Sequence, residues 1–189
     1  GEERIFQGKV RPSGEKILSL GDRQAAFIEK GGRTSVIGYK PQLARSGHGF
    51  VTALGVPEGN PADKTQLLPL VQQIQERTGI LPRDLSADDG YTSRQGRDDL
   101  LSAGVEQVSF SGSLGKKLLS EEEWNDPAYV AARKGRSAVE SLIFVLKHVF
   151  AFGRLRRRGR AEVEAELLEK VIAYNFCRML FVRRQKTAA

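Results

Sequence analysis

Two carboxylates, Asp88 and Glu140, stand in contexts that suit metal-ion chemistry. Asp88 closes the run DLSAD and comes directly before Asp89 and Gly90. It would therefore project from the C-terminal end of a predicted strand, where α/β folds bind ligands. Glu140 lies on a predicted helix fifty-two residues later and could fold back towards it. Carboxylate oxygens suit Mg²⁺, and a pair of such ions supports phosphodiester cleavage by activating the attacking oxygen and stabilising the leaving one.

The segment around Glu140 is strongly basic. Residues 127–161 contain one acid, Glu140, and nine basic residues: Arg133, Lys134, Arg136, Lys147, Arg154, Arg156, Arg157, Arg158 and Arg160. Two interpretations of Glu140 stay open. It pairs with Arg136 one helical turn earlier and has no further role, or it is a metal-binding or acid–base carboxylate held where the surrounding cations bind a polyanion.

The nine basic residues are candidate DNA contacts. The cluster at 154–160 is flanked by Gly153 and contains Gly159, but it contains no acid. It could be a solvated helix end, although contact with a phosphate backbone explains the one-sided charge better. The pI near 9.7 and the concentration of the charge in one segment favour a nucleic-acid partner.

Length and composition predict one globular domain in the cytoplasm. The chain has 189 residues, of which 40% are hydrophobic and 28% charged, enough for a single sizeable core. We expect the one cysteine, Cys177, to be a buried small hydrophobe, which fits a reducing compartment. The longest apolar run, 142–152, is interrupted by Lys147 and His148 and is too short to cross a membrane.

The elements that must position these residues follow from the apolar patterns. A polar lead-in (1–15) and a basic tail (183–189) flank the predicted domain at 16–182. Strands are predicted at 16–20, 36–43, 50–56, 84–88 and 105–110, with a hairpin joining the second and third. Helices are predicted at 64–77, with Asp63 as N-cap, at about 91–101, from 129 to about 150, and at 161–182. This order predicts a mixed α/β sheet, built from hairpin strands and β-α-β units, with flanking helices.

Several motifs together resemble a known family. They are Asp88-Asp89-Gly90-Tyr91, the helix run from Arg136 to Glu140, Leu146-Lys147, the RRRG of 156–159 and Asn175. Upstream, GEKILSL (14–20), the KGGR turn (30–33), IGYKPQL (37–43) and GNPAD (59–63) belong to the same pattern. In this order the motifs resemble the C-terminal part of bacterial insertion-sequence DDE transposases, of the ISNCY-like kind.

The resemblance implies an RNase H-like fold and an enzyme that cuts and rejoins DNA at element ends with Mg²⁺ or Mn²⁺. Asp88 matches the second catalytic Asp, and Glu140 matches the catalytic Glu; both would be metal ligands. Arg136 and Lys147 match the basic partners on that helix. An intact transposase could act as a homodimer, and DNA binding would associate it with the bacterial nucleoid.

One family residue has no counterpart. The resemblance places the first catalytic Asp on the strand that opens the fold, upstream of GEKILSL. Asp22 matches a variable turn, and we expect it to be a surface residue. We therefore expect a truncated or decayed copy that lacks the opening strand and its Asp.

Three hypotheses follow from these observations. The first is a DDE-type nucleotidyltransferase, inactive without the missing Asp. The second is a non-catalytic DNA-binding remnant, whose affinity for DNA would fall with salt and with loss of Arg156, Arg157 and Arg158. The third is a poorly folded remnant that exposes an unpaired sheet edge.

Overall fold

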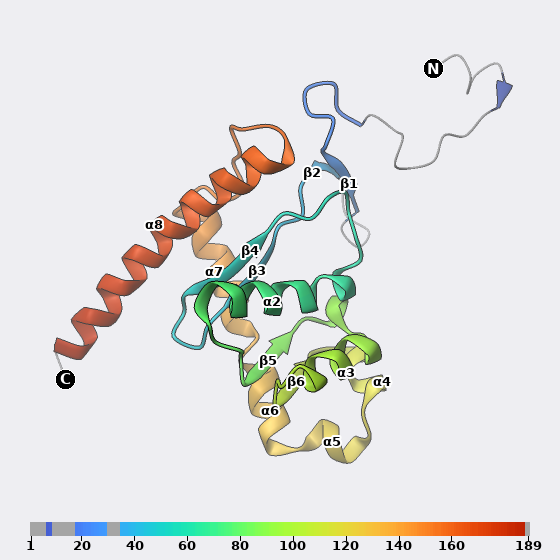
Figure 1. The fold of residues 1–189 in the computed structure, drawn as a ribbon, viewed down its shortest axis with the longest axis vertical. Coiled ribbons are helices and arrows are strands. Elements are labelled where there is room, and N and C mark those ends of the chain that lie inside the picture. The colour runs from blue at the N-terminus through green and yellow to red at the C-terminus, as the bar shows by residue number, and fades with distance from the viewer. Residues whose placement is uncertain (1–6, 9–17, 30–34, 188–189) are drawn as a thin grey trace.

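The computed structural model describes residues 7–8, 18–29 and 35–187 (Figure 1). The strands are β1 (Ala26–Ile28), β2 (Val36–Gly38), β3 (Gln42–Arg45), β4 (Val51–Gly55), β5 (Asp84–Ala87) and β6 (Gln107–Phe110). The helices are α2 (Leu67–Thr78), α3 (Arg94–Ser102), α4 (Ser113–Leu118), α5 (Glu121–Asn125), α6 (Pro127–Lys134), α7 (Ser137–His148) and α8 (Arg160–Thr187), with the 3-10 turns η2 (Asp63–Thr65) and η3 (Asp89–Tyr91). The predicted mixed α/β class is confirmed.

The strands pair two by two. β1 and β2 are antiparallel, β3 and β4 form the predicted antiparallel hairpin, and β5 and β6 are parallel. The prediction of one continuous mixed sheet is wrong for the described residues, where the strands form three two-stranded sheets. The physical reason is that β3 hydrogen-bonds only to β4 and β5 only to β6 in this part of the chain, so each keeps one edge without a strand partner.

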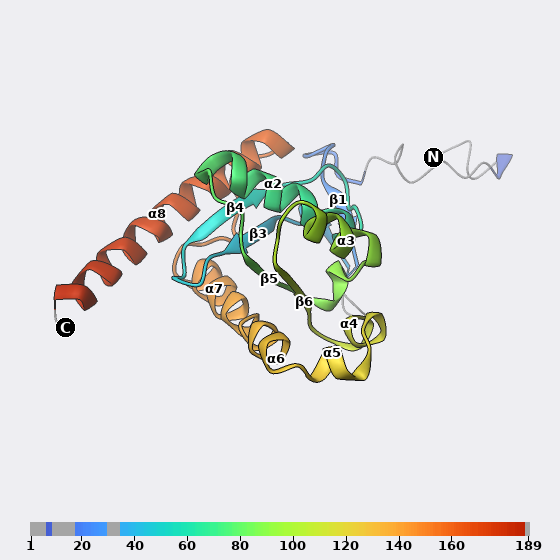
Figure 2. The same cartoon turned by 60° about the horizontal axis from the view of Figure 1, so that its bottom comes forward.

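Two apolar clusters hold these sheets in place. The first lies where α7 and α8 pack against the β3–β4 hairpin and contains Val51, Leu54, Val56, Leu142, Leu146, Phe152, Val163, Leu167 and Val171. The second joins α2 and α3 to β5 and β6 and contains Leu67, Val71, Ala87, Leu100, Val105, Val108 and Phe110. Figure 2 shows α2 and α7 on opposite sides of the β3–β4 hairpin, with the β5–β6 pair beside it. The β3–β4 and β5–β6 pairs therefore each have their own core.

Several N-terminal predictions change. Residues 18–20 are not a strand, whereas 16–17 and the KGGR turn at 30–33 lie outside the described residues, as does most of the lead-in. The predicted strand 36–43 is divided into β2 and β3. Pro41 lies in the gap, and it has no N–H to give to a strand ladder and restricts the residue before it.

The helices also differ in their bounds. The predicted helix from 129 divides into α6 and α7 at Gly135, the C-cap of α6. The last helix runs to Thr187, so the described part of the predicted basic tail is helical. The prediction of a buried Cys177 is wrong, because the thiol lies on an exposed part of α8. No helix of the described residues is both long and apolar enough to cross a membrane.

Candidate metal and DNA site

Asp88 lies where β5 ends, as predicted. Ala87, the last residue of the strand, is buried, and the chain then turns into η3 with Asp88 as its N-cap. The Asp88 Oδ1 accepts the backbone N–H of Asp89 at 2.7 Å. The cap holds the carboxylate at the strand end, and 60% of the side chain remains exposed.

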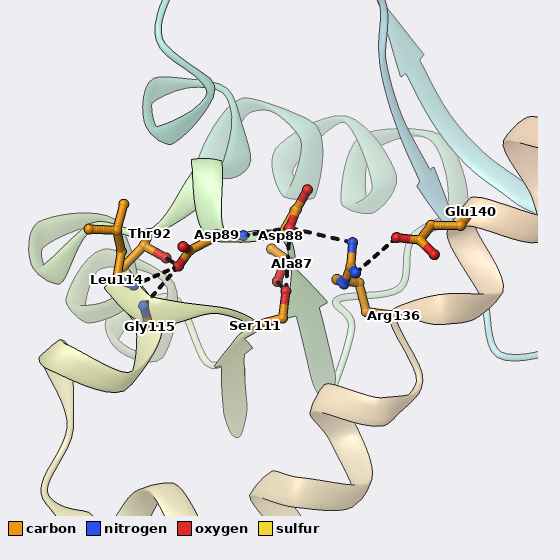
Figure 3. A network of polar contacts seen from close by, with 9 residues as sticks. All are labelled: Ala87, Asp88, Asp89, Thr92, Ser111, Leu114, Gly115, Arg136 and Glu140. Atoms are coloured by element: carbon orange, nitrogen blue, oxygen red, sulfur yellow. Dashed lines mark hydrogen bonds and ion pairs between the residues drawn. The ribbon is translucent and has the colours of Figure 1, made fainter. Parts of the chain in front are cut away.

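Arg136 links the two carboxylates (Figure 3). Its Nη2 lies 2.9 Å from Glu140 Oε1, one helical turn along the chain, so the ion pair of the first interpretation is present. Its Nη1 also lies 3.4 Å from Asp88 Oδ1. The Arg136 side chain is 27% exposed. Its guanidinium therefore contacts one acid at a strand end and another on α7.

The donors around this guanidinium fit a hard divalent cation. Asp88 and Glu140 offer only oxygen atoms, and their side chains are 60% and 64% exposed. Mg²⁺ and Mn²⁺ prefer such ligands, and Mg²⁺ retains several waters. Among the described residues no group of three or more His, Cys, Asp or Glu side chains gathers around one point. The two acids thus form a partial ligand set.

The Asp89 carboxylate, unlike that of Asp88, hydrogen-bonds to the start of α4. Its Oδ1 accepts the backbone N–H groups of Leu114 and Gly115, at 2.9 and 3.0 Å, at the start of α4. Gly112 lies so close that a Cβ there would come within 2.5 Å of the Asp89 carboxyl carbon, and its φ of +95° also favours glycine. The contacts of Asp89 therefore fix α4 beside the end of β6.

A polar network that the sequence did not predict connects η3 to β3. Tyr91 donates its hydroxyl to Gln42 Oε1 on β3, and Gln42 Nε2 donates to Asp63 Oδ1 at 3.0 Å. Lys40 Nζ lies 2.8 Å from the same carboxylate. The predicted N-cap role of Asp63 is wrong, because Asp63 is the first residue of η2 and Gln66 is the N-cap residue of α2. Burial raises the pKa of Tyr91, and the nearby charges of Asp63 and Asp88 raise it further, so the hydroxyl stays a donor.

The nine basic residues fall into two groups. Five already bind within the protein: Arg136 as above, Arg133 over the Trp124 ring at 3.8 Å, Arg157 to Glu169 at 2.7 Å, Arg158 to the Gly21 carbonyl at 3.3 Å and Arg160 to the Val56 carbonyl at 3.3 Å. The side chains of Lys134, Lys147, Arg154 and Arg156 have no hydrogen-bond or ion-pair partner among the described residues. These four are the cations most available to a polyanion.

The loop between α7 and α8 is held by a buried acid. The sequence has no acid within 154–160, but the fold brings Glu166 of α8 beneath the loop. Glu166 Oε2 accepts the backbone N–H groups of Arg156 and Arg157, at 2.8 and 2.9 Å, and Oε1 accepts Lys170 Nζ at 2.7 Å. The hydrogen bond from Lys170, followed by those from the loop, lowers the pKa of Glu166 to about 2.

Asp22 anchors the far end of the same loop. The expectation of a surface residue is wrong, because Asp22 is partly buried and accepts the Tyr39 hydroxyl at 2.8 Å and the Gly159 N–H at 3.0 Å. Partial burial by itself would raise the pKa of Asp22, but these hydrogen bonds outweigh it and hold the pKa below its ordinary value. Burial, together with Asp22, raises the pKa of Tyr39 to about 12. Asp22 is therefore a structural contact.

Comparison with known proteins gives one family. The family model described as Transposase DDE domain matches residues 19–176, which include both carboxylates and all nine basic residues. Comparisons with curated proteins and with solved structures gave no significant match. Such domains have an RNase H-like fold, act on DNA and generally use divalent metal ions. The chain belongs to the transposase DDE domain family.

Proposed function

We propose that this chain is a catalytic domain that cleaves and transfers DNA strands at the ends of a bacterial insertion sequence. Asp88 and Glu140 are the proposed catalytic residues and ligands of Mg²⁺ or Mn²⁺. The observation that carries the proposal is that these acids, fifty-two residues apart, converge on one guanidinium at the end of β5. Two copies would act together on DNA, and DNA binding would keep the protein at the nucleoid.

Each residue of the site has its own role in the proposed reaction. Asp88 and Glu140 supply carboxylate oxygens, and a bound metal ion would activate the attacking oxygen and stabilise the leaving one. Arg136 offsets the repulsion between the two acids. With DNA present, its guanidinium is expected to contact the phosphate, since guanidinium groups bind phosphate oxygens in pairs.

The edges of β3 and β5 that are unpaired within the described residues could accept a further strand that carries a third metal ligand. In residues 35–187 the pairs β3–β4 and β5–β6 are separate, and each has its own apolar cluster. We propose that a further strand, bearing a third carboxylate, pairs between β3 and β5 and joins them into one RNase H-like sheet. Two carboxylates alone should bind Mg²⁺ weakly, because Mg²⁺ holds its waters tightly.

Metal titration tests the ligand assignment. Mn²⁺ binding, followed by calorimetry, should be at least tenfold weaker in Asp88→Asn and in Glu140→Gln, because each change removes a charged ligand. Asp84→Asn is the matched control, since Asp84 begins the same strand and pairs with Arg83 on the surface. Mg²⁺-dependent nicking of plasmid DNA should follow the same order. Equal metal binding by all four proteins would refute the assignment.

A second candidate is a DNA-binding module without catalysis. The observation that favours it is Arg136, whose guanidinium pairs with both acids. This function predicts DNA affinity that is independent of Mg²⁺ and falls with salt. Replacing Lys134, Lys147, Arg154 and Arg156 with Ala should flatten the salt dependence by about one unit of slope per residue. Metal-dependent nicking would exclude this candidate.

A further inference from the structure

An aromatic side chain is exposed next to the proposed metal ligands. Phe144 follows Glu140 by one turn of α7, and it is 63% exposed. Its ring lies against the His148 ring, with 4.2 Å between the centroids and 38° between the planes. Since residues four apart lie on one helix face, Arg136, Glu140, Phe144 and His148 form a single stripe.

Phe144 has no part in the core. α7 buries Leu142 and Leu146, at 3% and 0% exposure, against the β3–β4 hairpin, so the apolar cluster is complete without the phenyl ring. The contact with His148 limits how the ring can turn. The helix therefore presents a partly preorganised aromatic face to solvent.

The charges around the ring indicate what could cover it. Arg136 and Lys147 lie on the same helix region, and Glu140 is its single acid, already paired with Arg136. An apolar protein surface would have to desolvate these cations, whereas a nucleic acid neutralises them with phosphates and offers bases that stack on aromatic rings.

We propose that Phe144 stacks against a nucleobase of a DNA strand that is unpaired next to the phosphate expected at Arg136, beside Asp88 and Glu140. This inference rests on the proposed function. One turn of helix separates Phe144 from Glu140 by about 6 Å, so the base adjoining the bound phosphate can reach the ring. Stacking would hold the strand in place and make Phe144 a positioning residue.

Binding of single-stranded DNA tests the proposal. The probe is a twelve-nucleotide strand carrying 2-aminopurine, whose fluorescence falls on stacking, measured with the full chain in Mg²⁺. Phe144→Ala should weaken binding about five- to tenfold and remove most of the quenching, because the base loses its stacking partner. Phe144→Trp should retain both. Phe144→Leu, which is apolar without a π face, should behave like Phe144→Ala.

Phe176→Ala is the matched control. Phe176 lies on α8 and is 58% exposed, close to the value for Phe144. Its replacement should leave both binding and quenching unchanged. Wild-type binding by Phe144→Ala, full rescue by Phe144→Leu, or an equal loss in Phe176→Ala would each overturn the stacking proposal.

The two proposals fail in different ways. If Phe144→Ala binds like wild type while Glu140→Gln loses Mn²⁺ binding, the stacking proposal is wrong and the metal ligands stand. If Phe144→Ala and Phe144→Leu lose single-strand binding while Glu140→Gln keeps Mn²⁺ binding, stacking stands and the metal assignment is wrong.

Discussion

Glu166 is the acid whose removal should most clearly destabilise the loop between α7 and α8. Its side chain is 9% exposed and receives three hydrogen bonds, two from backbone N–H groups of the loop and one from Lys170. Together they lower the pKa of Glu166 from 4.5 to about 2. At about 1.4 kcal/mol per pKa unit, that fall corresponds to about 3 kcal/mol of stabilisation. Screening by solvent at the exposed loop reduces this, and we expect about 2 kcal/mol.

Glu166→Gln should therefore lower the free energy of unfolding by about 2 kcal/mol at pH 7, measured by urea denaturation. The depressed pKa makes this contribution fully present above about pH 4.5 and lost as the pH falls towards 2. The difference between wild type and variant should accordingly shrink over that interval. The loss should also weaken DNA binding, because Arg154 and Arg156 lie on the loop that Glu166 holds.

Glu169→Gln is the control for this prediction. Glu169 pairs with Arg157 at 2.7 Å, but its side chain is 61% exposed, and exposed ion pairs contribute about 0–1 kcal/mol. Its replacement should lower the free energy of unfolding clearly less than that of Glu166. Equal losses in both variants, or a Glu166→Gln difference that stays constant from pH 7 to pH 3, would refute the reasoning.

Three other changes follow from single contacts. Asn175→Ala should lower the free energy of unfolding, measured by urea denaturation, by about 2 kcal/mol. The Asn175 side-chain amide hydrogen-bonds both the N–H and the C=O of Val51 at 2.9 Å, and its loss leaves both groups without this partner. An unchanged free energy of unfolding would contradict this. Tyr39→Phe should raise the pKa of Asp22 towards its ordinary value in an NMR titration, because the carboxylate loses its hydroxyl donor; an unchanged pKa would contradict it. Asp89→Ala should speed hydrogen exchange of the first amides of α4, because it removes their acceptor, and unchanged protection would contradict it.

Local sequence patterns were enough to predict most of the helices and strands. The hairpin followed from two apolar runs around a glycine-bearing turn, and the helix after Asp63 followed from its one-sided apolar residues. The strand predicted at 84–88 also followed from local composition, and β5 ends one residue earlier, at Ala87. These features depend on residues close together in the chain, which is why a sequence pattern reveals them. Strand pairing between distant segments does not leave such a pattern, and the prediction of one continuous sheet was wrong for the residues that the structure describes.

The sequence by itself determined the family motifs, the charge around Glu140 and its i, i+4 pairing with Arg136. Only the tertiary structure decided that Arg136 also contacts Asp88 and that Asp22 and Glu166 bind the loop after α7. The physical reason is distance along the chain. A helical turn fixes which side chains meet four residues apart, whereas contacts between residues far apart depend on how the packed cores orient α7 and α8 against the sheets.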